Sequence, residues 1–133
     1  MGIIETYQEP SRPIGPRRPE AESEPVGQAL GAIVAAAFGL GVDEVRSDGR
    51  GSADVSFARQ VAMYLAHTRL GLPFATTGRL FDRDRTTARH ACRQVEDRRE
   101  DPRVDHLLDC LERALDLSVD LTRFRGSRRP NAG

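Results

Sequence analysis

The chain has 133 residues, which suits one small domain with tails, and its formal net charge of zero says little by itself about partners. Aromatic residues make up 5% of the sequence and Trp is absent, so Ala, Leu, Val and a few Phe must supply the core. Strand-like alternation is nearly absent, and the longest apolar run is shorter than the roughly 20 residues that span a bilayer, so we expect an all-α protein without a membrane partner.

The first part of the chain predicts an arm without regular structure and then an apolar helix. Five prolines within residues 1–25, with little apolar material around them, favour a disordered tail. Apolar residues then recur every three or four positions until Gly39, which should end a helix. The expected elements are a helix over 27–40 with Leu30, Val34 and Phe38 on its buried side, a helical turn over 43–46, and a loop over 47–53.

The second part predicts four more helices. Asp54 or Ser56 can cap the first of them, and Asp84 or Thr86 can cap the third. Pro102 suits the first turn of the last. The expected helices cover 54–70, 73–80, 84–98 and the segment from Pro102 to about 119, and a basic disordered tail follows over 120–133. Residues 26–119 thus form the expected domain.

Charge is distributed unevenly along this neutral chain. Residues 54–100 hold nine Arg and six acidic residues, whereas 101–122 hold two Arg and six acidic residues. The last segment, 123–133, holds four Arg and no acidic residue. A locally basic middle segment suits a nucleic-acid site, although a solvated helix surface has the same composition.

Several classes of site are not expected. Cys92 and Cys110 occupy apolar helical positions, which predicts buried reduced thiols, and neither has zinc-ligand spacing. The sequence holds no GxxxxGK[ST] phosphate loop, so we expect no nucleotide and no other cofactor. No nucleophile–base pair or carboxylate pair can be assembled, so we do not expect an enzyme. No secretory signal pattern is visible at the N-terminus, which favours a cytoplasmic location.

Two short helices joined by a very tight turn at Asp82 and Arg83 predict a helix-turn-helix motif. The second helix would then enter the major groove of DNA. Its outer side offers Arg, Thr and His: Arg can donate two hydrogen bonds to guanine, and Thr can donate to a base edge or contact a thymine methyl. The free amides at the start of a helix can hold a phosphate.

Three stretches in this region resemble the C-terminal DNA-binding domain, domain IV, of the bacterial replication initiator DnaA. The first is ARQVAMYL at residues 58–65, close to the family pattern ARQ-x-AMYL. The second is Gly78 with Phe81, as in IG-x-x-F. The third is RDRTT at 83–87 followed by His90 and an alanine, close to RDHTTV-x-HA. The resemblance covers roughly residues 27–115 and implies a stand-alone domain that binds double-stranded DNA.

The resemblance also implies roles for individual residues. Arg59 matches an arginine that reaches into the minor groove, and His90 matches a position near the DNA backbone. Asp84, Thr86 and Thr87 match positions that read the major groove of the DnaA box. The complete set of expected DNA-binding residues is Arg59, Pro73, Phe74, Arg83, Asp84, Arg85, Thr86, Thr87, Arg89, His90 and Arg93.

Four departures from the family pattern bear on the DNA site. Arg85 stands where the family usually has His, which predicts a different base preference. Arg89 stands where an apolar residue is common, and Thr77 also replaces an apolar residue. The turn after Phe81 is one residue shorter than the usual F-G-x-R, which should rotate the second helix slightly.

We therefore expect sequence-specific binding to a DnaA-box-like site, a nucleoid location, regulation of chromosomal replication initiation, and replication-initiation proteins as further partners. Two alternatives remain open at this stage. One is a helix-turn-helix transcription regulator that acts at unrelated promoters. The other is a protein-interaction module that has lost its affinity for DNA, which the acidic segment 101–120 and the shortened turn would favour.

Overall fold

A computed structural model describes residues 23–46 and 52–127, and the predicted all-α fold is confirmed there. The helices are α1 (Ser23–Phe38), α2 (Val42–Arg46), α3 (Ala53–Thr68), α4 (Phe74–Leu80), α5 (Arg85–Arg98) and α6 (Pro102–Ser127). Residues 1–22 of the predicted tail 1–25, residues 128–133 of the predicted tail 120–133, and most of the predicted loop 47–53 lie outside the described residues.

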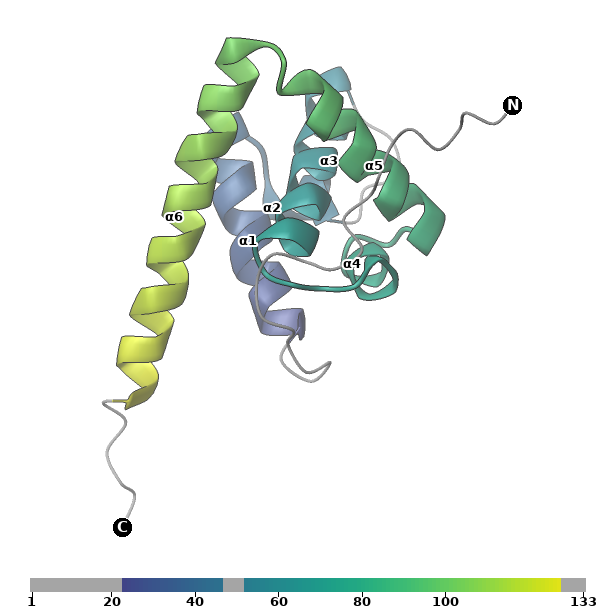
Figure 1. Cartoon of the computed structure of the whole chain (residues 1–133). Helices are drawn as coiled ribbons and strands as arrows, with labels where there is room; N and C mark the ends of the chain where they lie inside the picture. The colour runs from purple at the N-terminus through teal and green to yellow at the C-terminus, as the bar shows by residue number, and fades with distance from the viewer. Residues whose placement is uncertain (1–22, 47–51, 128–133) are drawn as a thin grey trace.

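Helix α3 lies at the centre of the domain. All its residues from Val61 to Thr68 are buried, because other helices cover every side of it. Figure 1 shows α1 and α6 on one side of α3 and α4 and α5 on the other. The core is built mainly from aliphatic residues, including Leu30, Val34, Val61, Leu65, Leu72, Val95 and Leu108.

Helices α1 and α3 begin earlier than the sequence predicts. Helix α1 begins at Ser23, inside the predicted tail, because Pro25 falls in the first turn, where proline removes no helical hydrogen bond. Arg46 also pairs with Glu24 at 2.9 Å and fastens this end. Helix α3 begins at Ala53, and its cap is Ser52, whose hydroxyl accepts from the Val55 amide at 3.3 Å.

Helix α6 continues to Ser127, so the disordered tail predicted from residue 120 is wrong for 120–127. No glycine or proline interrupts this helix before Gly126, and the apolar spacing continues through Val119 and Leu121. Cys110 lies on the exposed side of α6, which corrects its predicted burial, whereas Cys92 is buried as predicted.

The turn between α4 and α5 depends on a close backbone approach at Gly78. A Cβ atom placed on Gly78 would lie 2.6 Å from the carbonyl oxygen of Arg83 and 2.7 Å from that of Asp84. The Gly78 carbonyl accepts hydrogen bonds from the Phe81 amide at 3.0 Å and from the Arg83 amide at 2.7 Å. Only glycine therefore allows α4 and the start of α5 to meet in this way.

We predict that Gly78→Ala lowers the free energy of unfolding by about 1–3 kcal/mol, because the new methyl group collides with backbone that cannot move without opening the turn. Urea unfolding followed by circular dichroism measures the change. Gly41→Ala is the control, since a Cβ there meets nothing within 4 Å and should cost less than about 1 kcal/mol. Equal stability of wild type and Gly78→Ala would refute the close approach.

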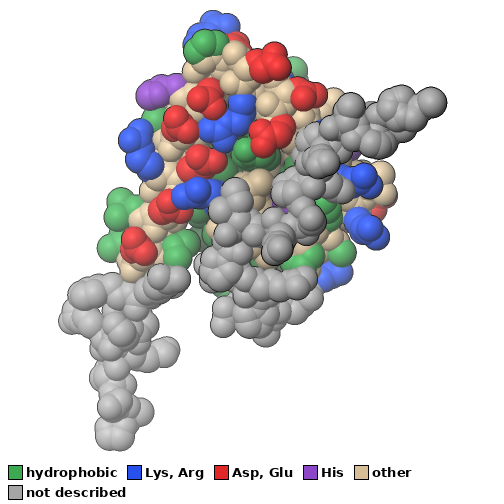
Figure 2. All heavy atoms as spheres, viewed as in Figure 1, with side chains coloured by type: hydrophobic (Ala, Val, Ile, Leu, Met, Phe, Trp, Pro, Cys, Tyr) green, Lys and Arg blue, Asp and Glu red, His purple; other side chains and the backbone are tan. Residues whose placement is uncertain are grey.

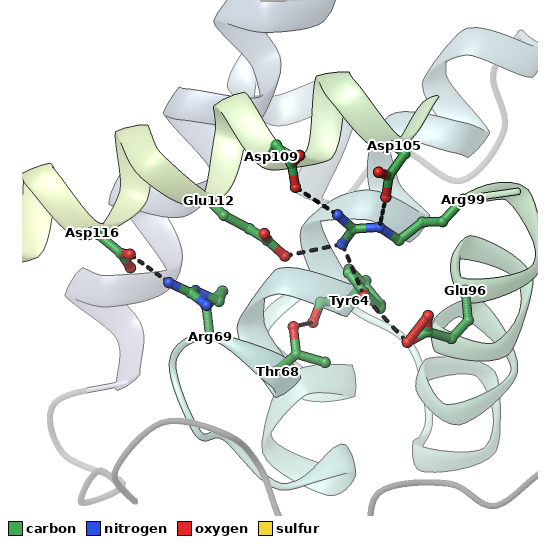
Figure 3. A network of polar contacts seen from close by, with 9 residues as sticks. All are labelled: Tyr64, Thr68, Arg69, Glu96, Arg99, Asp105, Asp109, Glu112 and Asp116. Atoms are coloured by element: carbon green, nitrogen blue, oxygen red, sulfur yellow. Dashed lines mark hydrogen bonds and ion pairs between the residues drawn. The ribbon is translucent and has the colours of Figure 1, made fainter. Parts of the chain in front are cut away.

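A network around Arg99 fastens α6 to the centre of the domain (Figure 3). The Arg99 guanidinium pairs with Asp105 at 2.6 Å, Asp109 at 2.9 Å and Glu112 at 3.1 Å on α6. It also donates to the Tyr64 hydroxyl on α3 at 3.1 Å. Burial lowers the pKa of Arg99, but hydrogen bonds to carboxylates and to this hydroxyl outweigh the burial and raise the pKa above its ordinary value. A permanent cation therefore holds the acidic side of α6.

Burial of Tyr64, one member of this network, makes stability depend on alkaline pH. Burial raises the pKa of Tyr64 to about 12, against about 10 in an unfolded chain. The protonated Tyr64 phenol therefore makes its full contribution to the free energy of unfolding below about pH 10. This contribution is lost as the pH rises from about 10 toward about 12. We predict that the free energy of unfolding falls more steeply between about pH 10 and 11.5 in wild type than in Tyr64→Phe, measured by urea titration. Parallel curves for the two proteins would contradict this.

Candidate nucleic-acid interface

Helix α5 buries one narrow side and exposes the rest. Its buried residues are Ala88, Ala91, Cys92 and Val95, all small or medium in size. Opposite them, at 100° per residue, the outward face centres on Thr86, His90 and Arg93. The structure brings six of the predicted DNA-facing residues onto this exposed surface: Arg85, Thr86, Thr87, Arg89, His90 and Arg93.

This surface is basic at its N-terminal end and acidic at its C-terminal end. Residues 83–93 hold four Arg and one Asp, whereas residues 96–101 hold four acidic residues and two Arg. Figure 2 shows basic side chains along the edge of the molecule where α5 lies. The N-terminal part of α5 is therefore the part suited to an anionic ligand.

Asp84 is the N-terminal cap of α5. Its carboxylate accepts from the Thr87 amide at 2.8 Å. Hydrogen bonds from the backbone amide and then the side chain of Thr87 lower the pKa of Asp84, although its side chain is fully exposed. The residue therefore stays ionised and fixes the first turn of the helix that carries the candidate DNA-facing residues.

The shortened turn places an ordinary residue in a backbone conformation that favours glycine. Asp82 has a φ of 58°, and aspartate tolerates this region better than most residues do. Arg83, which is half-buried, donates to the carbonyl oxygens of Asp82 at 2.9 Å and Phe81 at 3.3 Å. In this structure the Arg83 side chain therefore supports the turn.

Arg59 lies away from solvent, unlike a typical DNA-contacting arginine. Its side chain is 6% exposed and donates to the carbonyl oxygens of Val45 at 3.0 Å and Glu44 at 2.8 Å. These carbonyls belong to the last turn of α2, so Arg59 caps α2 and ties it to α3. The minor-groove contact implied by the resemblance would require the guanidinium to leave both carbonyls.

Arg46 extends this connection to the helix-turn-helix, a role that the sequence reasoning missed. It donates to the Leu80 carbonyl at the end of α4 from Nε at 3.1 Å and from Nη2 at 2.9 Å. It also bonds Glu24 and Gln28 of α1, each at 2.9 Å. A basic residue at the end of a short helix was the one available signal, and it carries no information about distant partners.

Pro73 and Phe74, predicted as DNA contacts, are half-buried at the start of α4. The Phe74 ring stacks on His67 with 3.9 Å between ring centroids. His67 is 3% exposed, and its Nδ1 lies 2.8 Å from the Leu72 carbonyl oxygen. Because a carbonyl only accepts, Nδ1 carries the proton. Phe74 therefore helps to position α4 against α3.

A pocket of about 110 Å³ lies between α3 and the first turns of α5. Arg59, Arg83 and His90 line it together with the polar residues Ser56, Gln60 and Thr87. Ser56 and Gln60 were not among the predicted site residues. This concave basic and polar surface beside α5 has the chemistry expected for a phosphate oxygen.

Residues 28–95 match the family described as the bacterial DnaA protein helix-turn-helix. The match spans more than half of the chain and contains α2, α3 and α4 in full and α5 as far as Val95. The chain belongs to this family of DNA-binding domains. Its α4 and α5 are the two helices joined by the tight turn, and in helix-turn-helix proteins the second helix is the recognition helix.

Two relatives place the same region within a larger protein. The chain is 33% identical over 81 residues to the chromosomal replication initiator protein DnaA of Lachnoclostridium phytofermentans. This alignment covers 59% of this chain and 18% of that protein. It is 38% identical over 68 residues to the protein of the same name from Bifidobacterium animalis subsp. lactis. That alignment covers 50% of this chain and 12% of that protein. The chain thus aligns with less than a fifth of each relative.

The described part of this DnaA-family domain holds no helix long and apolar enough to cross a membrane. Within the same residues, no three His, Cys, Asp or Glu side chains come together as a candidate metal site. Cys110 and His106 lie 3.7 Å apart on α6 without a third such neighbour in that part of the chain.

We predict that Arg59→Ala lowers the free energy of unfolding by about 2–4 kcal/mol, because it removes buried charge-assisted hydrogen bonds and leaves the end of α2 uncapped. Thermal and urea unfolding measure this. The fully exposed Arg103 on α6 supplies a charge-matched control, Arg103→Ala, which should leave the unfolding midpoint unchanged. A stable Arg59→Ala protein would instead return Arg59 to the list of residues available for DNA.

Proposed function

We propose that this chain binds double-stranded DNA in a sequence-specific manner, with α5 in the major groove at a site related to the DnaA box, and thereby regulates the initiation of chromosomal replication. The observation that carries the proposal is the exposed row Thr86, His90 and Arg93 on a recognition helix whose position is fixed by its neighbours. Arg and Thr are side chains that read base edges, and His and Arg can also contact phosphate.

The surroundings of α5 support the same proposal. The start of the helix is ordered by Asp84, so its face is held in place before DNA arrives. Arg83, Thr87 and His90 lie around the pocket beside α5, where a backbone phosphate would set the register of the helix in the groove. The Arg59 guanidinium donates hydrogen bonds to two carbonyl oxygens of α2. The exposed residues of α5 are therefore tested for DNA contact before Arg59.

Fluorescence anisotropy with a DnaA-box duplex and a scrambled duplex, each at two salt concentrations, tests this function. We predict that Thr86→Ala weakens binding to the box about tenfold with little effect on the scrambled duplex, because it removes a base contact. Arg93→Ala should weaken binding to both duplexes and reduce the salt slope by about 1 if it contacts phosphate. Arg103→Ala, with the same charge change on α6, should leave both affinities unchanged.

Arg85→His adds a test of specificity, since it restores the residue usual in the family. It should increase the preference for the DnaA box over the scrambled duplex. A second assay adds a full-length replication initiator DnaA to the same duplex, where this chain should compete for the site. No salt-sensitive binding to either duplex would overturn the DNA proposal. Equal affinity for both duplexes in wild type would overturn the specific site and favour a relaxed one.

A further inference from the structure

Helix α6 presents two apolar faces, and only one of them is used inside the domain. Leu108, Leu111 and Leu115 are buried against the core. Within the described residues, the two large apolar side chains left exposed are Leu117 at 60% and Leu121 at 58%. Figure 1 shows that the C-terminal end of α6 extends beyond the other helices.

The exposed face follows a coiled-coil spacing. Cys110, Ala114, Leu117 and Leu121 are all exposed and are separated by four, three and four positions. This is the spacing of the a and d positions in a heptad repeat. At 100° per residue the row lies about a third of a turn from the buried face. Figure 2 shows hydrophobic side chains gathered on this lower part of α6, on the side away from the other helices.

We propose that two copies of this chain form a homodimer in which their α6 helices pack antiparallel along residues 110–121, with Leu117 at the centre. Arg113 and Asp120 lie on the same flank of the exposed row, three or four positions to either side of Leu117. In the antiparallel arrangement Arg113 of each copy faces Asp120 of the other, so the surface is complementary to itself in charge. Neither residue has an ion pair with another described residue.

Side chains that face each other across the antiparallel interface centred on Leu117 also match in size. When Leu117 meets Leu117 of the second copy, Ala114 lies opposite Leu121, so a small residue faces a large one. A parallel pair would instead place Leu121 against Leu121 and Cys110 against Cys110, without the two ion pairs. The antiparallel pair therefore buries both exposed leucines and brings Arg113 of each copy beside Asp120 of the other.

The proposed dimer leaves the recognition helix accessible. In Figure 1, α5 and α6 lie on opposite sides of the domain, with α1 and α3 between them. Dimerisation thus requires no DNA, and it stands whether or not the proposed DNA function is correct. The interface covers about two heptads, so the association should be reversible and depend on concentration.

Sedimentation equilibrium of the full chain without DNA tests the dimer. Wild type should show a monomer–dimer equilibrium, and Leu117→Glu and Leu121→Glu should each weaken it at least tenfold, because a charge enters the apolar seam. Ala36→Glu, at an exposed position of α1, is the control and should not change it. A wild type that stays monomeric at high concentration, or a Leu117→Glu protein that dimerises normally, would overturn the proposal.

Charge exchange tests the antiparallel orientation. Arg113→Asp and Asp120→Arg should each weaken the dimer, and the double variant should restore it, because each new Asp again faces a new Arg. Arg113 and Asp120 are both exposed, so circular dichroism should show unchanged folding. The two Cys110 residues would lie about 21 Å apart along the helix axis, so oxidation should give no cross-link. Failure of the double variant to recover, or efficient Cys110 cross-linking, would overturn the antiparallel arrangement.

Discussion

The backbone contact at Gly78 is the constraint on which the candidate site depends. At this position α4 lies so close to the residues that begin α5 that no side-chain atom fits between them. The Gly78 carbonyl then accepts two amide hydrogen bonds from the turn. The angle between the two helices follows from this contact, and it decides which side of α5 faces the core and which faces solvent. The exposure of Thr86, His90 and Arg93 is therefore a consequence of a residue that has no side chain.

Arginine supplies the connections that hold the motif in place. Arg59 joins α3 to the end of α2, and Arg46 joins α2 to the end of α4. Each guanidinium donates to backbone carbonyls that a short helix leaves without partners, so the planar group replaces a conventional C-terminal cap. Arg99 has the corresponding role for α6, where its partners are carboxylates. These three arginines have structural roles, whereas the arginines of α5 are exposed to solvent.

Zero net charge conceals a division of the molecule into surfaces with different chemistry. The start of α5 is basic, and the adjacent pocket is lined by arginine, histidine and hydroxyl groups. Much of the acidic side of α6 is turned toward Arg99 and Arg69, so it neutralises internal cations. The remaining side of α6 exposes Leu117 and Leu121 between charges of opposite sign. DNA binding and self-association, as proposed, would therefore use separate surfaces of one small domain.

The sequence by itself determined the helical class, most helix ends, the pair of helices joined by a tight turn and the exposed residues of the second of them. Those features depend on local spacing, on Gly39 and Asp84 as terminal residues, and on a motif of neighbouring positions. Only the tertiary structure decided that Arg59 is buried, that Phe74 stacks on His67 and that Cys110 is exposed. Burial depends on what packs against a residue from distant parts of the chain, and periodicity shows only which residues share a face. The same reason applies to the two apolar faces of α6. They look alike in the sequence, and only the structure shows that the core covers one of them while the other is exposed to solvent.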